Sequence, residues 1–178
     1  MLDIIALVFL TSPAPPVYGQ AIWRQIVGPN AILLYKDASK DFYYCTWAIE
    51  FDLPNLGAFD FVKDRPLAFR IRWKREHAEG VKPGFFLQVI INGRNFPFTI
   101  VRVNPEPVLT DVEGEFAGGI PIQTPRDLWQ RLADAKSFRV YLPNGEFKDA
   151  ETSDFNRASQ ALLRCLNEAS DLNKAASR

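Results

Sequence analysis

The sequence is poor in the side chains that most often hold metals or act as general bases. Its 178 residues include one histidine, one methionine and two cysteines. A single imidazole excludes most histidine metal sites and would make any histidine catalysis depend on His77 alone. No GxSxG, Walker-type, HExxH or CxxC motif is present. The sequence therefore predicts no catalytic residue, no metal site and no cofactor.

An excess of charge of one sign and a long apolar run are also missing. Lysine plus arginine and aspartate plus glutamate each number 21. This balance gives no reason to expect nucleic acid or an anionic membrane surface as a partner. The apolar run near the N-terminus covers only residues 4–10, far short of the roughly 20 residues that cross a bilayer. We therefore expect no transmembrane span.

Residues 1–19 have the pattern of a secretory signal peptide. The short apolar run is followed by a proline-rich break at 11–16 and by Val-Tyr-Gly at 17–19, which predicts cleavage after Gly19. However, no lysine or arginine precedes the apolar run, and Asp3 is acidic. The alternative is that this segment forms the first strand of a cytosolic domain.

Aromatic and alternating apolar residues are abundant, with 14 phenylalanines and four tryptophans. Such side chains favour a β-rich core. Period-two alternation is clearest at 42–53 and 67–75. In the first of these segments, Cys45, Trp47, Ile49 and Phe51 share one face, and Thr46, Glu50 and Asp52 share the other. Further strands are expected at 31–36, 138–142 and 146–148.

The segment 85–103 predicts a hairpin. Asn92-Gly93 favours a type I′ turn, because both residues tolerate positive φ. A two-residue turn there pairs Val89 with Phe96, Leu87 with Phe98, and Phe85 with Ile100, all on one apolar face. Pro97 should then lie on an edge strand, or with its missing N–H turned outward.

Two helices complete the predicted fold. One begins at Thr124-Pro125 and ends at Lys136, and the other covers about 154–169, capped by Ser153 or Asp154. Residues 104–119 are expected to form an irregular loop and 170–178 a polar tail. The prediction is one α+β domain over 20–169, in which two helices cover a twisted, largely antiparallel sheet of about six to eight strands, sandwich- or half-barrel-like.

Cys45 and Cys165 are both expected to face the core. In an oxidising compartment they should form a disulfide, which would contribute about 4–5 kcal/mol in the chain-entropy model. The alternative is two buried free thiols.

Two polar groups are candidate sites. Arg70, Arg72 and Lys74, with Arg75 beside them, form a basic row that could bind an anionic partner. The alternative is a solvated sheet face paired with acids such as Glu50 and Asp52. The adjacent Glu76 and His77 could perform acid–base chemistry.

Several segments together resemble bacterial periplasmic proteins of the invasion-associated locus B type. The segments are FYYCTWAIEF (42–51), QVIINGRNFPF (88–98), TPRDLWQRLADAKSF (124–138), RVYLP (139–143) and SDFNRASQALLRC (153–165). The resemblance covers roughly 22–166 and implies a periplasmic, non-enzymatic protein with no catalytic residues to transfer. The chain departs from that pattern in its long proline-rich segment at 104–119, in the absence of lysine and arginine before residue 4, and in the strand that carries the basic row.

These observations predict a non-catalytic periplasmic or secreted protein, closed by a disulfide, that binds another protein or an envelope component. It would be cytoplasmic if residues 1–19 form a first strand. One alternative is a small exported hydrolase using Glu76 and His77 with groups from 104–119. The other is a polyanion-binding module using Arg70, Arg72 and Lys74.

Overall fold

The computed structural model describes residues 20–37, 42–52, 55–62, 65–72, 79–103, 115–119 and 125–177. Within these residues ten antiparallel strands form a single sheet, accompanied by two helices. The α+β class with a largely antiparallel sheet is therefore confirmed. The sheet is larger than the six to eight strands expected.

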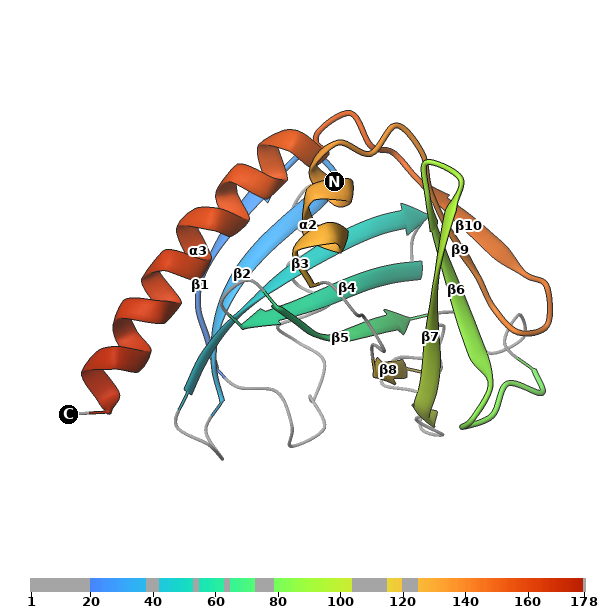
Figure 1. Cartoon of the computed structure of the whole chain (residues 1–178), viewed down its shortest axis with the longest axis horizontal. Coiled ribbons are helices and arrows are strands. Elements are labelled where there is room, and N and C mark those ends of the chain that lie inside the picture. Colours follow the sequence, from blue (N-terminus) through green and yellow to red (C-terminus); the bar gives the residue numbers. More distant parts are fainter. Residues whose placement is uncertain are drawn as a thin grey trace.

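The order across the sheet is β1-β2-β3-β4-β5-β8-β7-β6-β9-β10. Its first five strands are β1 (Gln20–Val27), β2 (Asn30–Asp37), β3 (Phe42–Asp52), β4 (Asn55–Val62) and β5 (Arg65–Arg72). The others are β8 (Glu115–Gly119), β7 (Arg94–Val103), β6 (Phe86–Ile91), β9 (Phe138–Tyr141) and β10 (Phe147–Ala150), and the helices are α2 (Pro125–Ala133) and α3 (Phe155–Ala176). The sheet curves strongly, so that β6, β7, β9 and β10 stand opposite α3 (Figure 1).

Three strands were not predicted, and each has a local reason. In β1 a register shift between Ala21 and Trp23 interrupts the alternation. In β4 a glycine interrupts the apolar pattern and serves close packing, because a Cβ at Gly57 would lie 3.0 Å from the ring of Phe51 and 3.2 Å from that of Phe69. The predicted irregular loop 104–119 is wrong at its end, where β8 pairs with both β5 and β7.

The hairpin of β6 and β7 is confirmed. Asn92 and Gly93 have φ of 50° and 78°, and Val89 pairs with Phe96 and Leu87 with Phe98 as expected. β7 is not an edge strand, but its ladder with β8 begins at Thr99. The missing N–H of Pro97 therefore interrupts no bond of that described ladder.

Aromatic rings join the two ends of the curved sheet in one core. The ring of Phe138 on β9 lies 6.0 Å from Phe51, 6.2 Å from Phe59 and 5.8 Å from Phe155, measured between centroids. Phe59 stacks on Phe69 at 4.3 Å. These contacts connect β3, β4, β5, β9 and α3, so the core extends across the whole fold.

β3 is buried on both faces rather than on one. The predicted inward residues Cys45, Trp47 and Ile49 are fully buried. On the opposite face, Tyr44 and Ala48 belong to a second buried cluster with residues of β2 and β4.

The two cysteines form the predicted disulfide. Their Cα atoms lie 6.1 Å apart, and the bond joins β3 to α3 across 120 residues of sequence. Both cysteines are fully buried. The expectation that Cys45 and Cys165 both face the core is therefore confirmed.

α3 is longer than predicted. It continues to Ala176, so the expected polar tail from residue 170 is helical over most of its length. The N–H of Tyr43 donates to Asn173 Oδ1 at 2.7 Å, and Asn173 Nδ2 donates to the Tyr43 carbonyl at 2.9 Å. Asp154 occupies the N-cap position but makes no capping bond, and it pairs with Arg157 at 2.8 Å instead. In the described part of the chain, no helix is long and apolar enough to cross a membrane.

Candidate binding groove

The structure places only part of the predicted basic row. Arg70 and Arg72 lie in β5, whereas Lys74, Arg75, Glu76 and His77 lie outside the described residues. Arg72 is in register with Glu115 of β8 on one side and with Leu56 of β4 on the other, and Leu56 is in register with Glu50 of β3. Glu50 is thus separated from Arg72 by β4, and the acidic residue in register with Arg72 on an adjacent strand is Glu115 rather than Glu50 or Asp52. Burial raises the pKa of Glu50.

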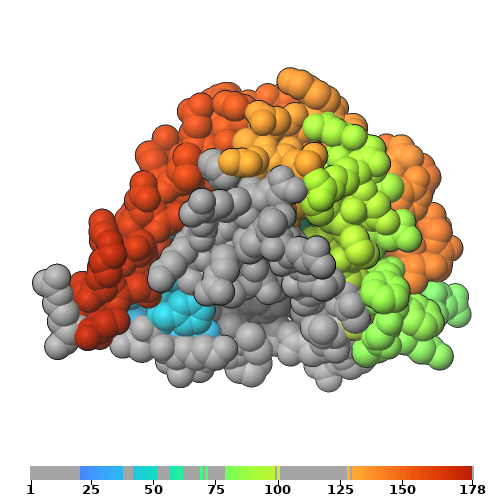
Figure 2. Space-filling view, in the orientation of Figure 1, coloured from blue at the N-terminus to red at the C-terminus, as the bar shows by residue number. Residues whose placement is uncertain are grey.

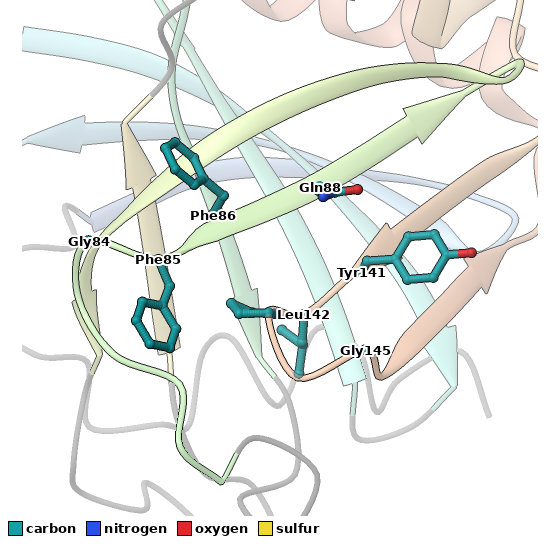
Figure 3. Close-up of a pocket in the computed structure, with 8 residues that line it drawn as sticks. Gly84, Phe85, Phe86, Gln88, Tyr141, Leu142 and Gly145 are labelled. Carbon is teal, nitrogen blue, oxygen red and sulfur yellow. The ribbon is translucent and has the colours of Figure 1, made fainter.

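A groove lies at the other end of the sheet, where β9 ends beside the start of β6. Its volume is about 600 Å³, within the range of ligand-binding pockets. The lining residues are Gly84, Phe85, Phe86, Gln88, Tyr141, Leu142, Pro143 and Gly145. Figure 3 shows Phe85 and Phe86 pointing to opposite sides of the chain at this point.

A tight turn and a bulge build one wall of the groove. The N–H of Phe85 donates to the Lys82 carbonyl at 3.2 Å, and Gly84 has a φ of 88° after Pro83, as in a type II turn. Gly84 and Phe85 then both oppose Ile100: the Gly84 N–H donates to the Ile100 carbonyl, and the Ile100 N–H donates to the Phe85 carbonyl, each at 2.8 Å. This is the hydrogen-bond pattern of a β-bulge.

Because of the bulge, the side chain of Phe85 is exposed rather than buried. The predicted pairing with Ile100 exists, but Phe85 is 44% exposed rather than part of the core. Its neighbour Phe86 is 57% exposed. The expectation that Phe85 is buried is therefore wrong, because the bulge and the end of β9 leave its ring at the rim of the sheet.

A turn after β9 forms the opposite wall. The β6–β9 ladder includes Gln88 paired with Tyr141, the last residue of β9. The chain then turns back, with the Gly145 N–H donating to the Leu142 carbonyl at 3.0 Å. This early turn leaves the first residues of β6 extending past the end of β9.

An ordered network lies beside the groove on β9 and β10. Arg139 donates to both carboxylate oxygens of Asp149, at 2.6 and 2.7 Å, and to the Tyr141 hydroxyl at 3.1 Å. Its guanidinium also lies 4.1 Å from the ring centroid of Phe147, which is 45% exposed. The hydrogen bonds to Asp149 raise the pKa of Arg139 and lower that of Asp149. The charge of Arg139 is thus balanced by that of Asp149, and the guanidinium contacts both Tyr141 and Phe147.

The chemistry of the groove suits an uncharged partner. None of its lining residues carries a charge, and the exposed Gln88 offers both a donor and an acceptor. Sequence reasoning missed this site. The available signal was the Phe85-Phe86 pair, because in an alternating strand only one of two consecutive side chains can face the core.

Comparison with known proteins assigns no family. No protein-family model, no curated protein and no solved structure matches the chain. The resemblance to the invasion-associated locus B type therefore stays a prediction, and function has to be inferred from the groove and the disulfide.

Proposed function

We propose that the protein is an exported, non-catalytic interaction protein that binds its partner through the aromatic groove. The observation that carries this proposal is the exposure of two consecutive phenylalanines, 44% for Phe85 and 57% for Phe86, at the rim of a groove. Burying a phenylalanine is worth about 1.5–3 kcal/mol. A partner that covers both rings would recover much of that free energy.

The disulfide supports export. A buried bond between Cys45 and Cys165 persists in the periplasm or outside the cell, whereas cytosolic reductants keep most thiols reduced. The predicted signal at 1–19 lies outside the described residues. Sequencing the N-terminus of protein recovered from a secreting host tests export: a start at Gln20 is expected, and an intact Met1 would contradict it.

The binding surface is tested by capture from envelope extract. Wild-type protein is compared with Phe85→Ser/Phe86→Ser and with Leu163→Ser. Leu163 is a suitable control because it is similarly exposed, at 42%, but lies on α3. A partner retained by wild type and by L163S, but lost by the double variant, is expected. Equal capture by all three proteins would exclude the groove as the binding surface.

A further inference from the structure

We propose that the groove binds an extended, uncharged peptide segment of the partner, added as a short strand to the open edge of β6 at Phe86. This inference rests on the proposed function and specifies the chemistry of the partner. Extended peptides bind exposed sheet edges through backbone hydrogen bonds, while side-chain pockets supply specificity.

The N–H and carbonyl groups of Phe86 point away from β7. The hydrogen bond donated by the Ile100 N–H directs the carbonyl of Phe85 toward β7. Because backbone groups alternate along a strand, the N–H and carbonyl of the next residue, Phe86, point to the other side, where β9 would lie.

At that point β9 is no longer present. The β6–β9 ladder begins at Gln88 opposite Tyr141. Two residues further along the same register, the position opposite Phe86 would fall to Pro143, which has no N–H and follows the end of β9. The edge of β6 at Phe86 is therefore open toward the groove.

The side chains around this edge are arranged for a strand. Phe85 lies on the side of Leu142, whereas Phe86 points from the opposite side of the chain (Figure 3). Tyr141 and Leu142, also consecutive, line the other wall. A strand laid between the walls would thus direct alternate side chains onto apolar surfaces on both of its faces.

Charge determines which peptide fits. The lining residues are uncharged, and Arg139 on β9, beside the groove, is already bound by both oxygens of Asp149. No lining residue offers a countercharge to an acidic segment, and burial of any charge in the groove would be unfavourable. We therefore assign the site to a segment with apolar side chains and a free backbone.

The probe is a phage-displayed library of random linear heptapeptides. It is selected on oxidised wild-type protein after depletion on Phe85→Ser/Phe86→Ser protein, whose thermal unfolding is first matched to wild type. We expect enriched peptides with apolar residues at alternate positions. A synthetic copy should shift the Phe86 amide resonance and slow its hydrogen exchange. N-methylation of the peptide residue opposite Phe86 should weaken binding by about tenfold or more.

Several results would overturn the inference. These are failure to enrich any peptide, binding that leaves the Phe86 amide unchanged, and tolerance of N-methylation at every position. A dimer of the wild-type chain that Phe86→Ser dissociates would assign the edge to a second copy instead. If the envelope partner still depends on Phe85 and Phe86 while peptides fail, the proposed function stands and only the strand-addition mode is wrong.

Discussion

The two ends of the curved sheet are held together in different ways. The stapled half, β1–β5 with α3, depends on contacts between distant residues: Cys45 with Cys165, Tyr43 with Asn173, and Trp23 with Glu168 are separated by 120, 130 and 145 residues. The open half, β6, β7, β9 and β10, contains no cysteine and is held by two hairpins, by the β6–β9 ladder and by the pair of Arg139 with Asp149. Figure 2 shows α3 and the β6–β7 hairpin at opposite ends of one face.

The two halves also differ in what their side chains contribute, because one stabilises the fold and the other offers rings to a partner. The stapled half satisfies even its buried polar atoms, since Trp47 Nε1 donates to Asn30 Oδ1 at 2.9 Å and both side chains are fully buried. Among the described residues, the open half exposes the three aromatic rings of Phe85, Phe86 and Phe147, whereas the stapled half exposes the aliphatic side chains of Ile22 and Leu163. Substitutions in the first region should therefore affect unfolding, whereas substitutions at the groove should affect recognition.

The strongest way to break the stapled half is to remove its disulfide. Cys45→Ala/Cys165→Ala should lower the free energy of unfolding by about 4–5 kcal/mol, because the bond closes a loop of 120 residues. Urea unfolding measures this loss, and reduced wild-type protein is the matched control. Hydrogen exchange should accelerate more in β2 and β3 than in β6 and β7. A loss below about 1 kcal/mol would show that packing alone holds α3 in place.

The next effect concerns the ring that joins the two halves. Phe138→Ala should cost about 3–5 kcal/mol, because the ring contacts Phe51, Phe59 and Phe155 across the core. Phe138→Leu, which fills more of the space, should cost less. Equal unfolding midpoints for wild type and F138A would mean that the halves are stable independently of each other.

A smaller effect is expected at the end of α3. Asn173→Ala removes both hydrogen bonds to the backbone of Tyr43 and should cost about 1–2 kcal/mol. Asn173→Asp keeps the acceptor for the Tyr43 N–H and loses only the donor, so its cost should be intermediate. Exchange of the Tyr43 amide provides a local readout. Unchanged protection in N173A would indicate that this contact contributes nothing.

The smallest effect is a pH dependence in the open half. Hydrogen bonds from Arg139 lower the pKa of Asp149 below its ordinary 3.8. The pair therefore contributes stability that is present above that ordinary value and is lost as the pH falls through the lower folded pKa. A pH titration of the carbon-13 NMR signal of the Asp149 carboxyl should show the lowered pKa in wild type. In Arg139→Gln the pKa should return toward 3.8. The same midpoint in both proteins would contradict the pairing.

Patterns that depend on neighbouring residues were predictable. Asn92-Gly93 sets both the turn and the register of β6 and β7. Cys165 on α3 faces the core as expected, together with Phe155 and Leu162. β8 was not predictable, because a short glycine-containing strand between two others is defined by its partners rather than by its own composition.

The groove escaped prediction for a related reason. Nothing local to Phe85 and Phe86 shows that β9 ends at Tyr141, since the pairing of β6 with β9 crosses about fifty residues of sequence. The bulge at Gly84 could be suspected from Pro83-Gly84, but its effect on exposure depends on that distant end. The basic strand, in contrast, is obvious in the sequence, and Arg70 and Arg72 fall in β5 as expected.

The disulfide between Cys45 and Cys165 also sets an order of events during biogenesis. Cys45 is synthesised 120 residues before Cys165. The strands from β3 to β10 are therefore all synthesised while the Cys45 thiol still lacks its partner. If the chain crosses a membrane unfolded, oxidation can lock the domain only after α3 has followed the sheet into the same compartment. The bond would then mark completed translocation, and slow oxidation would leave a reduced chain open to proteolysis.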